Sequence, residues 1–206
     1  MKLYYSPGAC SLSPHIVALE ASIPLKLEKV DTKAKRTASG ADFWVVNPKG
    51  YVPVLELDSG EVLTEGPAIV QYLADQKPDS GLAPANGTLP RYHLQEMLGY
   101  INSEIHKSYS PLFQPETPEA TRAERKEYLQ RRYRLIENLL EKQPFLLGDK
   151  FSVADAYLFT VTNWAKPVGL DLSGFPALLA FQKRISERPA VREALEAEGL
   201  VKKAHA

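Results

Sequence analysis

The spacing of apolar residues changes period several times within residues 1–78, as in a domain that mixes short strands with helices. Residues 25–30 alternate apolar and charged side chains with the period of two that is typical of a half-buried strand. A strand before them and a helix between form a β-α-β unit, whose strands we expect to be parallel. An Asp-Ser-Gly turn at 58–60 predicts a hairpin. The predicted elements are strands at 2–5, 25–30, 52–57 and 61–64, helices at 12–21 and 67–75, and a short helix that opens at Phe43.

From residue 89 onward the apolar residues recur at helical spacing, and the strand pattern stops. A stretch rich in proline, glycine and small polar residues precedes this part and is typical of a linker. The patterns predict an α/β domain with the thioredoxin-like element order β-α-β-(α)-β-β-α, followed by an all-α helical bundle. The predicted bounds are 1–78 for the first domain, 79–88 for the linker and 89–206 for the all-α domain, with helices at 89–109, 129–140, 153–164, 176–186 and 190–198.

Composition and charge narrow the classes of function. The 206 residues are 44% hydrophobic and 24% charged, as in ordinary globular proteins. Lys and Arg total 25, and so do Asp and Glu, so the net charge of zero argues against a nucleic-acid partner. No apolar segment reads as a secretion signal or reaches the ~18 residues of a membrane span. We therefore expect a cytoplasmic protein without a membrane partner.

Cysteine and histidine usage argues against disulfide and metal chemistry. One cysteine allows neither an internal disulfide nor a cysteine-based metal cluster. The four histidines, at positions 15, 93, 106 and 205, lack the spacing of metal ligands, so we expect no metal.

The one cysteine, Cys10, lies where the sequence predicts a strand, a turn and then a helix. Pro7 and Gly8 favour the turn, which places Cys10 near a helix N-terminus, an environment that favours a thiolate. Residues 10–13 also have the C-x-x-S form of a redox motif without its second cysteine, which forms mixed disulfides but cannot close its own. A lone cysteine is also often a small buried apolar residue. The sequence leaves these interpretations open.

Two short segments carry features of a site for a peptide or an amino acid. Pro53 suits an ordinary edge strand, but a cis bond after Val52 would let the Val52 backbone pair with an extended peptide. At Glu65-Gly66, a helix N-terminus that would bind a carboxylate follows an acidic side chain that would bind an ammonium group. The same residues also suit a plain helix start.

Three further positions lie together on the helix predicted over 89–109. Helical spacing places Gly99, Ser103 and His106 on one face, beside the apolar stripe. A single histidine is more often structural or exposed, so the role of His106 stays open. Ser152 and Asp155 match a capping box, and we interpret them as structural rather than as a catalytic pair.

Together these segments resemble cytosolic glutathione transferases, specifically the bacterial beta class, over essentially the whole chain. The resemblance implies a thioredoxin-like domain and an α-helical domain, assembled as a homodimer, with glutathione as co-substrate. The motifs that carry it are Tyr5-Ser6-Pro7-Gly8-Ala9-Cys10-Ser11, Asn47-Pro48 to Val52-Pro53-Val54-Leu55, Leu63-Thr64-Glu65, and Leu147-Gly148-Asp149 to Ser152-Val153-Ala154-Asp155.

The resemblance also implies a role for each candidate residue. Two positions depart from the family, because Gly66 stands where Ser or Thr is common and Gly99 where the beta class often has Asn. Tyr5 and Ser11 would be helpers in thiol activation. The implied contacts with the glutathione sulfur are Cys10 and His106, and the Val52 backbone beside a cis Pro53 would contact the cysteinyl unit. Glu65 and Gly66 would contact the γ-glutamyl group, and Lys35 the glycine carboxylate. The helix that lines the site and reaches across the dimer interface would carry Gly99, Ser103, Glu104 and His106.

The sequence therefore predicts a transferase that stabilises the glutathione thiolate for attack on a small hydrophobic electrophile, such as a halogenated or nitroaromatic compound. One alternative is glutathione-dependent thiol–disulfide exchange through a mixed disulfide at Cys10. Another is a non-catalytic binding protein on the same fold.

Overall fold

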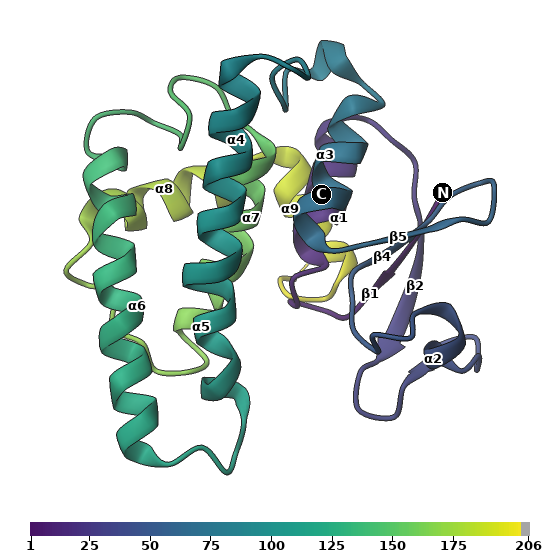
Figure 1. Ribbon diagram of the computed structural model, residues 1–206, viewed down its shortest axis with the longest axis horizontal. Coiled ribbons are helices and arrows are strands. Elements are labelled where there is room, and N and C mark those ends of the chain that lie inside the picture. The colour runs from purple at the N-terminus through teal and green to yellow at the C-terminus, as the bar shows by residue number, and fades with distance from the viewer. Residues whose placement is uncertain (203–206) are drawn as a thin grey trace. The chain divides into compact units, whose positions relative to one another are not determined.

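The computed structural model describes residues 1–202, which form two compact units (Figure 1). Unit 1 combines Met1–Ala83 with the segment that begins at Ser186, and unit 2 is Pro84–Ile185. Residues 186–202 lie outside the helical unit, in contrast to the predicted bounds of 89–206 for the all-α domain. These residues belong to unit 1 because helix α9 (Pro189–Ala197) packs against helix α1 (Leu12–Glu20).

Unit 1 is built on a five-stranded sheet with the strand order β3-β2-β1-β4-β5. Strands β1 and β2 are parallel, as predicted for the β-α-β unit, and the other neighbouring pairs are antiparallel. The elements of unit 1 are β1 (Lys2–Tyr5), α1, β2 (Lys26–Asp31), β3 (Arg36–Thr37), α2 (Phe43–Val46), β4 (Val54–Glu56), β5 (Val62–Thr64), α3 (Gly66–Asp75), a 3-10 turn at Pro78–Ser80, and α9.

Strand β3 is absent from the elements predicted by the sequence. It has two residues, paired with Val30 and Asp31 of β2, and so short a strand cannot show an alternating pattern. The turn into it is formed by the Asp31 carboxylate, which accepts from the N–H groups of Lys33 and Ala34 at 2.9 Å each. The polar stretch after β2 thus extends the sheet by one edge strand.

Strand β1 buries residues on both faces of the sheet because successive side chains alternate. Leu3 is wholly buried, as is its register partner Leu55. On the opposite face Tyr4 packs against Phe43 of α2 and Val54 of β4. Helices α1 and α3 lie together on one side of the sheet, and α2 covers the other (Figure 1).

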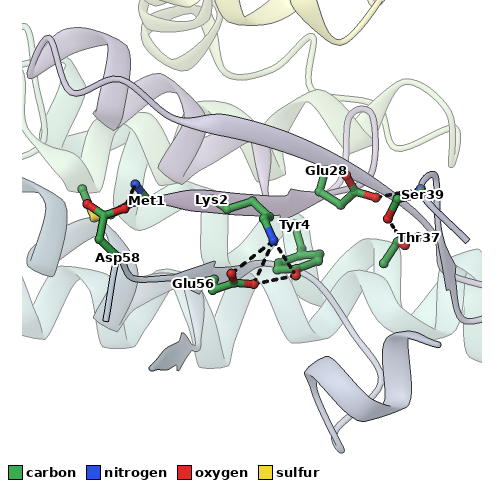
Figure 2. A network of polar contacts seen from close by, with 8 residues as sticks. All are labelled: Met1, Lys2, Tyr4, Glu28, Thr37, Ser39, Glu56 and Asp58. Carbon is green, nitrogen blue, oxygen red and sulfur yellow. Dashed lines mark hydrogen bonds and ion pairs between the residues drawn. The ribbon is translucent and has the colours of Figure 1, made fainter. Parts of the chain in front are cut away.

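A polar network joins β1 to β4 at the margin of the Tyr4 face (Figure 2). Lys2 Nζ donates to both carboxylate oxygens of Glu56 at 3.1 Å, and the Tyr4 hydroxyl donates to Glu56 at 2.6 Å. The N-terminal ammonium of Met1 pairs with Asp58 at 2.7 Å. The hydrogen bond from Tyr4, followed by the one from Lys2, holds the pKa of Glu56 below its usual range. Glu56 therefore joins the two strands as a carboxylate.

Unit 2 is helical, as predicted for the second half of the chain. Within residues 1–202 every strand precedes residue 65. Helix α7 is buried along its whole length, as its nearly continuous apolar sequence indicates. The helices of unit 2 are α4 (Leu89–Tyr100), α5 (Lys107–Tyr109), α6 (Glu119–Leu140), α7 (Val153–Thr162) and α8 (Pro176–Ser186), with a π-helix at Ile101–His106 and 3-10 turns at Ser110–Phe113 and Asn163–Ala165.

The π-helix separates α4 from α5 within the helix predicted over residues 89–109. Its i→i+5 hydrogen bonds change which side chains share a face, a property that a regular helical pattern does not reveal. Ile101 and Ile105 are buried, as the apolar stripe predicts. Gly99 and Ser103 are exposed, whereas His106 is partly buried. The three residues expected on one face therefore differ in their surroundings.

Buried carboxylates cap two helices of unit 2. Glu137 of α6 accepts from the N–H groups of Ala177 and Leu178 in the first turn of α8, at 2.9 and 2.8 Å. The capping box predicted at Ser152 and Asp155 is present at the start of α7, and the Ser152 hydroxyl also donates to the Asp155 carboxylate at 2.7 Å. Burial raises the pKa of Asp155 to about 6. Both carboxylates thus belong to the framework of the helices.

Side chains near α9 tie unit 1 together across the length of the chain. Arg188 donates to both carboxylate oxygens of Glu20, at 2.6 and 2.7 Å. Glu198 is buried, accepts from the Gly8 N–H at 2.9 Å and lies 2.9 Å from His15 Nδ1. The C-terminal segment therefore contacts both the end of α1 and the loop that precedes it.

Candidate functional site

Cys10 lies in the loop between β1 and α1, immediately before Ser11, the N-cap of α1. Gly8 has φ +70°, a conformation that glycine adopts without a steric penalty and that shapes the loop. Cys10 Sγ donates to the carbonyl oxygen of Val52 at 3.2 Å. A thiol can make this contact and a thiolate cannot, because the thiolate has no proton to donate. Cys10 is therefore a hydrogen-bond donor at a helix start.

The two predicted helpers have different surroundings. Ser11 is wholly buried, and its hydroxyl accepts from the Ser6 N–H at 3.1 Å and donates to the Ser6 carbonyl at 3.2 Å. This hydroxyl therefore holds the loop in place through the backbone of Ser6. The ring of Tyr5 lies 6.4 Å from that of His15, and burial, followed by the charge of Glu198, raises the pKa of the Tyr5 hydroxyl. Tyr5 is thus a neutral phenol at physiological pH.

Four consecutive residues, the 49–52 segment, connect the candidate residues of unit 1. The buried side chain of Asn47 shapes this segment by donating to the Tyr51 carbonyl at 2.8 Å and accepting from the Lys49 N–H at 3.1 Å. The peptide bond between Val52 and Pro53 is cis, one of the two configurations that the sequence left open. Along the segment, Lys49 and Tyr51 contact Glu65, Gly50 contacts Lys35, and Val52 contacts Cys10.

Glu65 presents its carboxylate at the start of helix α3. It accepts from Lys49 Nζ at 2.6 Å and from the Tyr51 hydroxyl at 2.8 Å, and its side chain is half exposed. Its φ of +69° lies in the left-handed region, which is costly for a residue with a side chain. Gly66 follows as the first helical residue, so its N–H has no partner within the helix. An acidic side chain and a helix N-terminus are thus adjacent, as the pattern predicted.

Lys35 is held beside the same segment. Its Nζ donates to the Gly50 carbonyl at 2.6 Å and lies 5.4 Å from the centre of the Trp44 ring. The Trp44 ring covers Gly50 so closely that an added Cβ would lie 2.3 Å from it, which explains glycine at this position. Lys35 also has a positive φ, +54°. Its ammonium group is therefore fixed by backbone and aromatic contacts.

In unit 2, His106 is the last residue of the π-helix and contacts α7. His106 Nδ1 lies 2.5 Å from the Tyr157 hydroxyl oxygen, and that hydroxyl donates to Asn102 Oδ1 at 2.9 Å. The Trp164 ring packs edge-on against the imidazole, with ring centres 4.9 Å apart and planes at 70°. These contacts fix both the position and the plane of the imidazole.

The other candidates in unit 2 contact α6 or their own helix. The Tyr128 hydroxyl donates to Glu104 at 2.5 Å, and Arg132 forms an ion pair with Glu104 at 2.9 Å. The hydrogen bond from Tyr128, with a smaller effect of the Arg132 charge, lowers the pKa of Glu104. The Ser103 hydroxyl donates to the Gly99 carbonyl at 3.0 Å. Glu104 thus connects the π-helix to α6.

The family of this chain follows from comparison with known proteins. The family model described as glutathione S-transferase, N-terminal domain, matches residues 8–76, and the one described as glutathione S-transferase, C-terminal domain, matches residues 100–189. The glutathione S-transferase GstA of Escherichia coli O157:H7 is 46% identical over 97% of this chain and 100% of its own length. The chain belongs to the glutathione S-transferase family.

Solved structures extend this result. A sphingomonad glutathione S-transferase complexed with glutathione is 47% identical, with a TM-score of 0.94 over 98% of this chain and all of the other. The beta class glutathione S-transferase of Sphingomonas chungbukensis is 46% identical, with a TM-score of 0.95 over the same shares. This transferase therefore has the fold predicted from its sequence and resembles the bacterial beta class.

The structure brings together some of the candidate residues of this glutathione S-transferase. In unit 1 the 49–52 segment connects Cys10, Lys35 and Glu65, with Gly66 next in the chain. In unit 2 His106 and Glu104 share the π-helix but contact different helices, α7 and α6. The functional role of each residue stays a prediction.

Three residues that contact the candidates were not predicted from the sequence. Lys49 and Tyr51 both donate to the Glu65 carboxylate. The sequence signal that could have identified this contact is the cation Lys49 in the turn that precedes Pro53. Tyr157 contacts His106 and donates to Asn102, and no local signal identifies Tyr157 because it lies 51 positions from His106 in the chain.

Across residues 1–202, no helix combines the length and the apolar character needed to cross a membrane. The same residues contain no group of three or more His, Cys, Asp or Glu that could hold a metal ion.

Proposed function

We propose that this glutathione S-transferase binds glutathione on unit 1 and promotes attack of its thiolate on small hydrophobic electrophiles, including halogenated and nitroaromatic compounds. The proposed glutathione contacts are Cys10, Lys35, Val52, Glu65 and Gly66 of unit 1 and Gly99, Ser103, Glu104 and His106 of unit 2. Cys10 and His106 are the residues proposed to act on the glutathione sulfur.

The observation that carries the proposal is the convergence of complementary groups on the 49–52 segment. Glutathione has an ammonium and a carboxylate at its γ-glutamyl end and a second carboxylate at its glycine end. Glu65 and the Gly66 N–H suit the first pair, and Lys35 suits the second carboxylate. The Val52 backbone between them suits a peptide strand.

Binding of glutathione gives Cys10 a specific role in this proposal. The Val52 carbonyl accepts from the Cys10 thiol at 3.2 Å. We propose that the cysteinyl N–H of glutathione donates to the Val52 carbonyl oxygen in place of the Cys10 thiol. The displaced Cys10 thiol then donates a hydrogen bond to the glutathione sulfur. A hydrogen bond to a charged group contributes about 1.5–3 kcal/mol, which would lower the pKa of the bound glutathione thiol by roughly one to two.

Thiol–disulfide exchange through Cys10 has less support. The nucleophile in that reaction is a thiolate. The Cys10 contact with a carbonyl oxygen favours the protonated thiol, which suits a donor better than a nucleophile.

Two Cys10 variants test the proposal against the alternative. Cys10→Ser keeps a hydrogen-bond donor without redox chemistry, and Cys10→Ala removes both. We expect conjugation of chlorodinitrobenzene to fall about 5- to 50-fold in Cys10→Ala and by less than about threefold in Cys10→Ser. Equal loss in both variants, together with lost disulfide reduction, would favour the exchange reaction. Absence of saturable binding at millimolar glutathione would overturn both enzymatic functions.

We also propose a homodimer, in which the helix that carries Ser103 and Glu104 contributes polar contacts to the glutathione bound by the partner subunit. Sedimentation equilibrium of the full chain tests this proposal. A mass of one chain at micromolar concentration would contradict it.

A further inference from the structure

Lys49 is a cation of the 49–52 segment that is not among the proposed glutathione contacts. Its Nζ donates to the Glu65 carboxylate at 2.6 Å and to the Thr64 hydroxyl at 2.9 Å. Thr64 ends strand β5, and Glu65 directly precedes the first residue of α3, so the two acceptors are consecutive in the chain. The ammonium group of Lys49 is therefore held where β5 leads into the N-terminus of α3.

This ammonium group can form a further hydrogen bond to a ligand. A lysine ammonium has three N–H bonds. Across residues 1–202 its hydrogen-bond partners are Thr64 and Glu65, which use two of the three. The side chain is 46% exposed, and the hydrogen bond to Glu65 raises the pKa of Lys49, so the group is charged at neutral pH. Lys49 thus offers both a donor and a positive charge.

The γ-glutamyl end of glutathione has charges that complement this ion pair. Its ammonium and its carboxylate are attached to the same carbon atom, and the charges of Lys49 and Glu65 are likewise adjacent. When two such pairs lie side by side in opposite order, each charge is next to charges of opposite sign, which lowers the Coulomb energy. In this order the ligand's ammonium contacts Glu65 and its carboxylate contacts Lys49.

The glycine at position 66 makes a second group for the carboxylate important. Gly66 offers a carboxylate its backbone N–H and the partial positive charge of the helix N-terminus, but no side-chain donor. A hydrogen bond from the Lys49 ammonium adds the attraction of a full charge to these contacts. Lys49 thus supplies an interaction that the residue at position 66 does not.

We infer that Lys49 is a further binding residue for glutathione, which donates to the carboxylate of the γ-glutamyl group while it stays paired with Glu65. The inference rests on the proposed function, because it takes glutathione as the ligand of unit 1. It also makes Lys49 a determinant of specificity. The site then selects thiol peptides whose γ-glutamyl group carries both an ammonium and a carboxylate over analogues that lack the carboxylate.

Calorimetric titration of the full chain with two ligands tests this inference. The first ligand is glutathione, and the second is 4-aminobutanoyl-cysteinylglycine, which is glutathione without the γ-glutamyl carboxylate. In Lys49→Met we expect the Kd for glutathione to rise about 3- to 10-fold, a moderate effect because the ion pair is partly exposed. The Kd for the second ligand should not rise, because this ligand has no carboxylate to contact Lys49.

Two control variants separate this contact from other effects of the substitution. Lys77→Met removes a positive charge from an exposed residue beyond the other end of α3, and it should leave both Kd values unchanged. Tyr51→Phe removes a second donor to the same Glu65 oxygen without a change in charge. It should change both Kd values by the same factor, which is the pattern of a residue that acts through Glu65 alone.

The outcomes distinguish this inference from the proposed function. Equal weakening of both ligands in Lys49→Met would overturn the inference and leave Lys49 as a support for Glu65. Tighter glutathione binding in this variant would also contradict it, because Lys49 would then compete with the ligand's ammonium for Glu65. An unchanged Kd for glutathione would exclude the contact as well. Wild-type protein without saturable glutathione binding would instead overturn the proposed function, and the inference with it.

Discussion

At the scale of single residues, Gly66 lies where the structure has room for a larger side chain, but glycine offers no side-chain hydrogen bond. Its backbone φ is not positive, and an added Cβ would meet Pro53 Cγ at 4.0 Å, an ordinary contact. Glycine is therefore not required by the fold at this position. Its consequence is the lack of a side-chain donor beside Glu65, at the proposed γ-glutamyl contact.

Gly66→Ser should strengthen glutathione binding. The hydroxyl adds one hydrogen bond, worth about 0.5–1.5 kcal/mol, so we expect the Kd to fall about 2- to 10-fold. Titration calorimetry measures the Kd. Gly66→Ala, which adds the same Cβ without a hydroxyl, is the control and should bind as the wild type does. Equal gains in both variants would contradict a hydrogen-bond origin.

A second residue-scale prediction concerns Glu56 and acid stability. Its pKa is lowered in the folded state, so its stabilisation is present above the ordinary pKa of a carboxyl, ~4.3, and is lost as the pH falls through the lower folded value. Because the side chain is partly exposed, we expect Glu56→Gln to lower the free energy of unfolding at pH 7 by about 1 kcal/mol. Urea unfolding between pH 3 and pH 7 measures this. The difference between variant and wild type should shrink toward pH 3, and a constant difference would contradict the assignment to Glu56.

At the scale of elements, helix α8 begins on a carboxylate supplied by another helix. Glu137 of α6 is buried and accepts from two N–H groups of the first turn of α8. A carboxylate there also interacts favourably with the helix dipole. The side chain thus replaces a local cap and fixes α8 against α6.

Glu137→Ala should destabilise unit 2 strongly. Two N–H groups, one buried and one partly buried, lose their acceptor, and we expect the free energy of unfolding to fall by about 2–4 kcal/mol. Chemical denaturation monitored by circular dichroism gives this value. Glu137→Gln keeps one acceptor oxygen and should lose about half as much. A loss below about 0.5 kcal/mol in Glu137→Ala would show that water or another group replaces the cap.

The elements also show which parts of the fold can be predicted from the sequence. The local sequence predicted the long helices by their periodicity, the parallel β1–β2 pair by the β-α-β connection and the capping box at Ser152 by its motif, because each depends on residues close in the chain. It missed β3, which is too short for a pattern, and the π-helix, whose extra residue per turn leaves the apolar stripe intact. In the site, candidates were recognised by residue type and motif. Their partners, such as Tyr157 for His106, depend on tertiary packing that the local sequence does not encode.

At the scale of the whole molecule, unit 1 is assembled from both ends of the chain. The segment after Ser186 contacts α1 and the loop that carries Cys10, although more than 160 residues separate Glu20 from Arg188. Contacts of such long sequence separation form at a high cost in loop entropy and have no local signature. Local patterns therefore predict only that this segment is helical, which assigns it to the all-α domain.

Two variants of this segment should separate stability from binding. Glu198→Ala removes the acceptor of the Gly8 N–H, and Arg188→Ala breaks the ion pair with Glu20 at the other end of α1. We expect the free energy of unfolding to fall by about 2–4 kcal/mol in Glu198→Ala and by about 1–2 kcal/mol in Arg188→Ala. Glutathione affinity should fall about 3- to 10-fold in Glu198→Ala alone, because Gly8 lies in the loop that positions Cys10.

Denaturation and calorimetry on the same samples measure both effects. Equal affinities in the two variants would show that the Cys10 loop keeps its conformation without Glu198, and the C-terminal segment would then contribute stability alone. A selective loss in Glu198→Ala would instead make the last residues of unit 1 part of the support for its proposed thiol site, joining the two ends of the chain in one function.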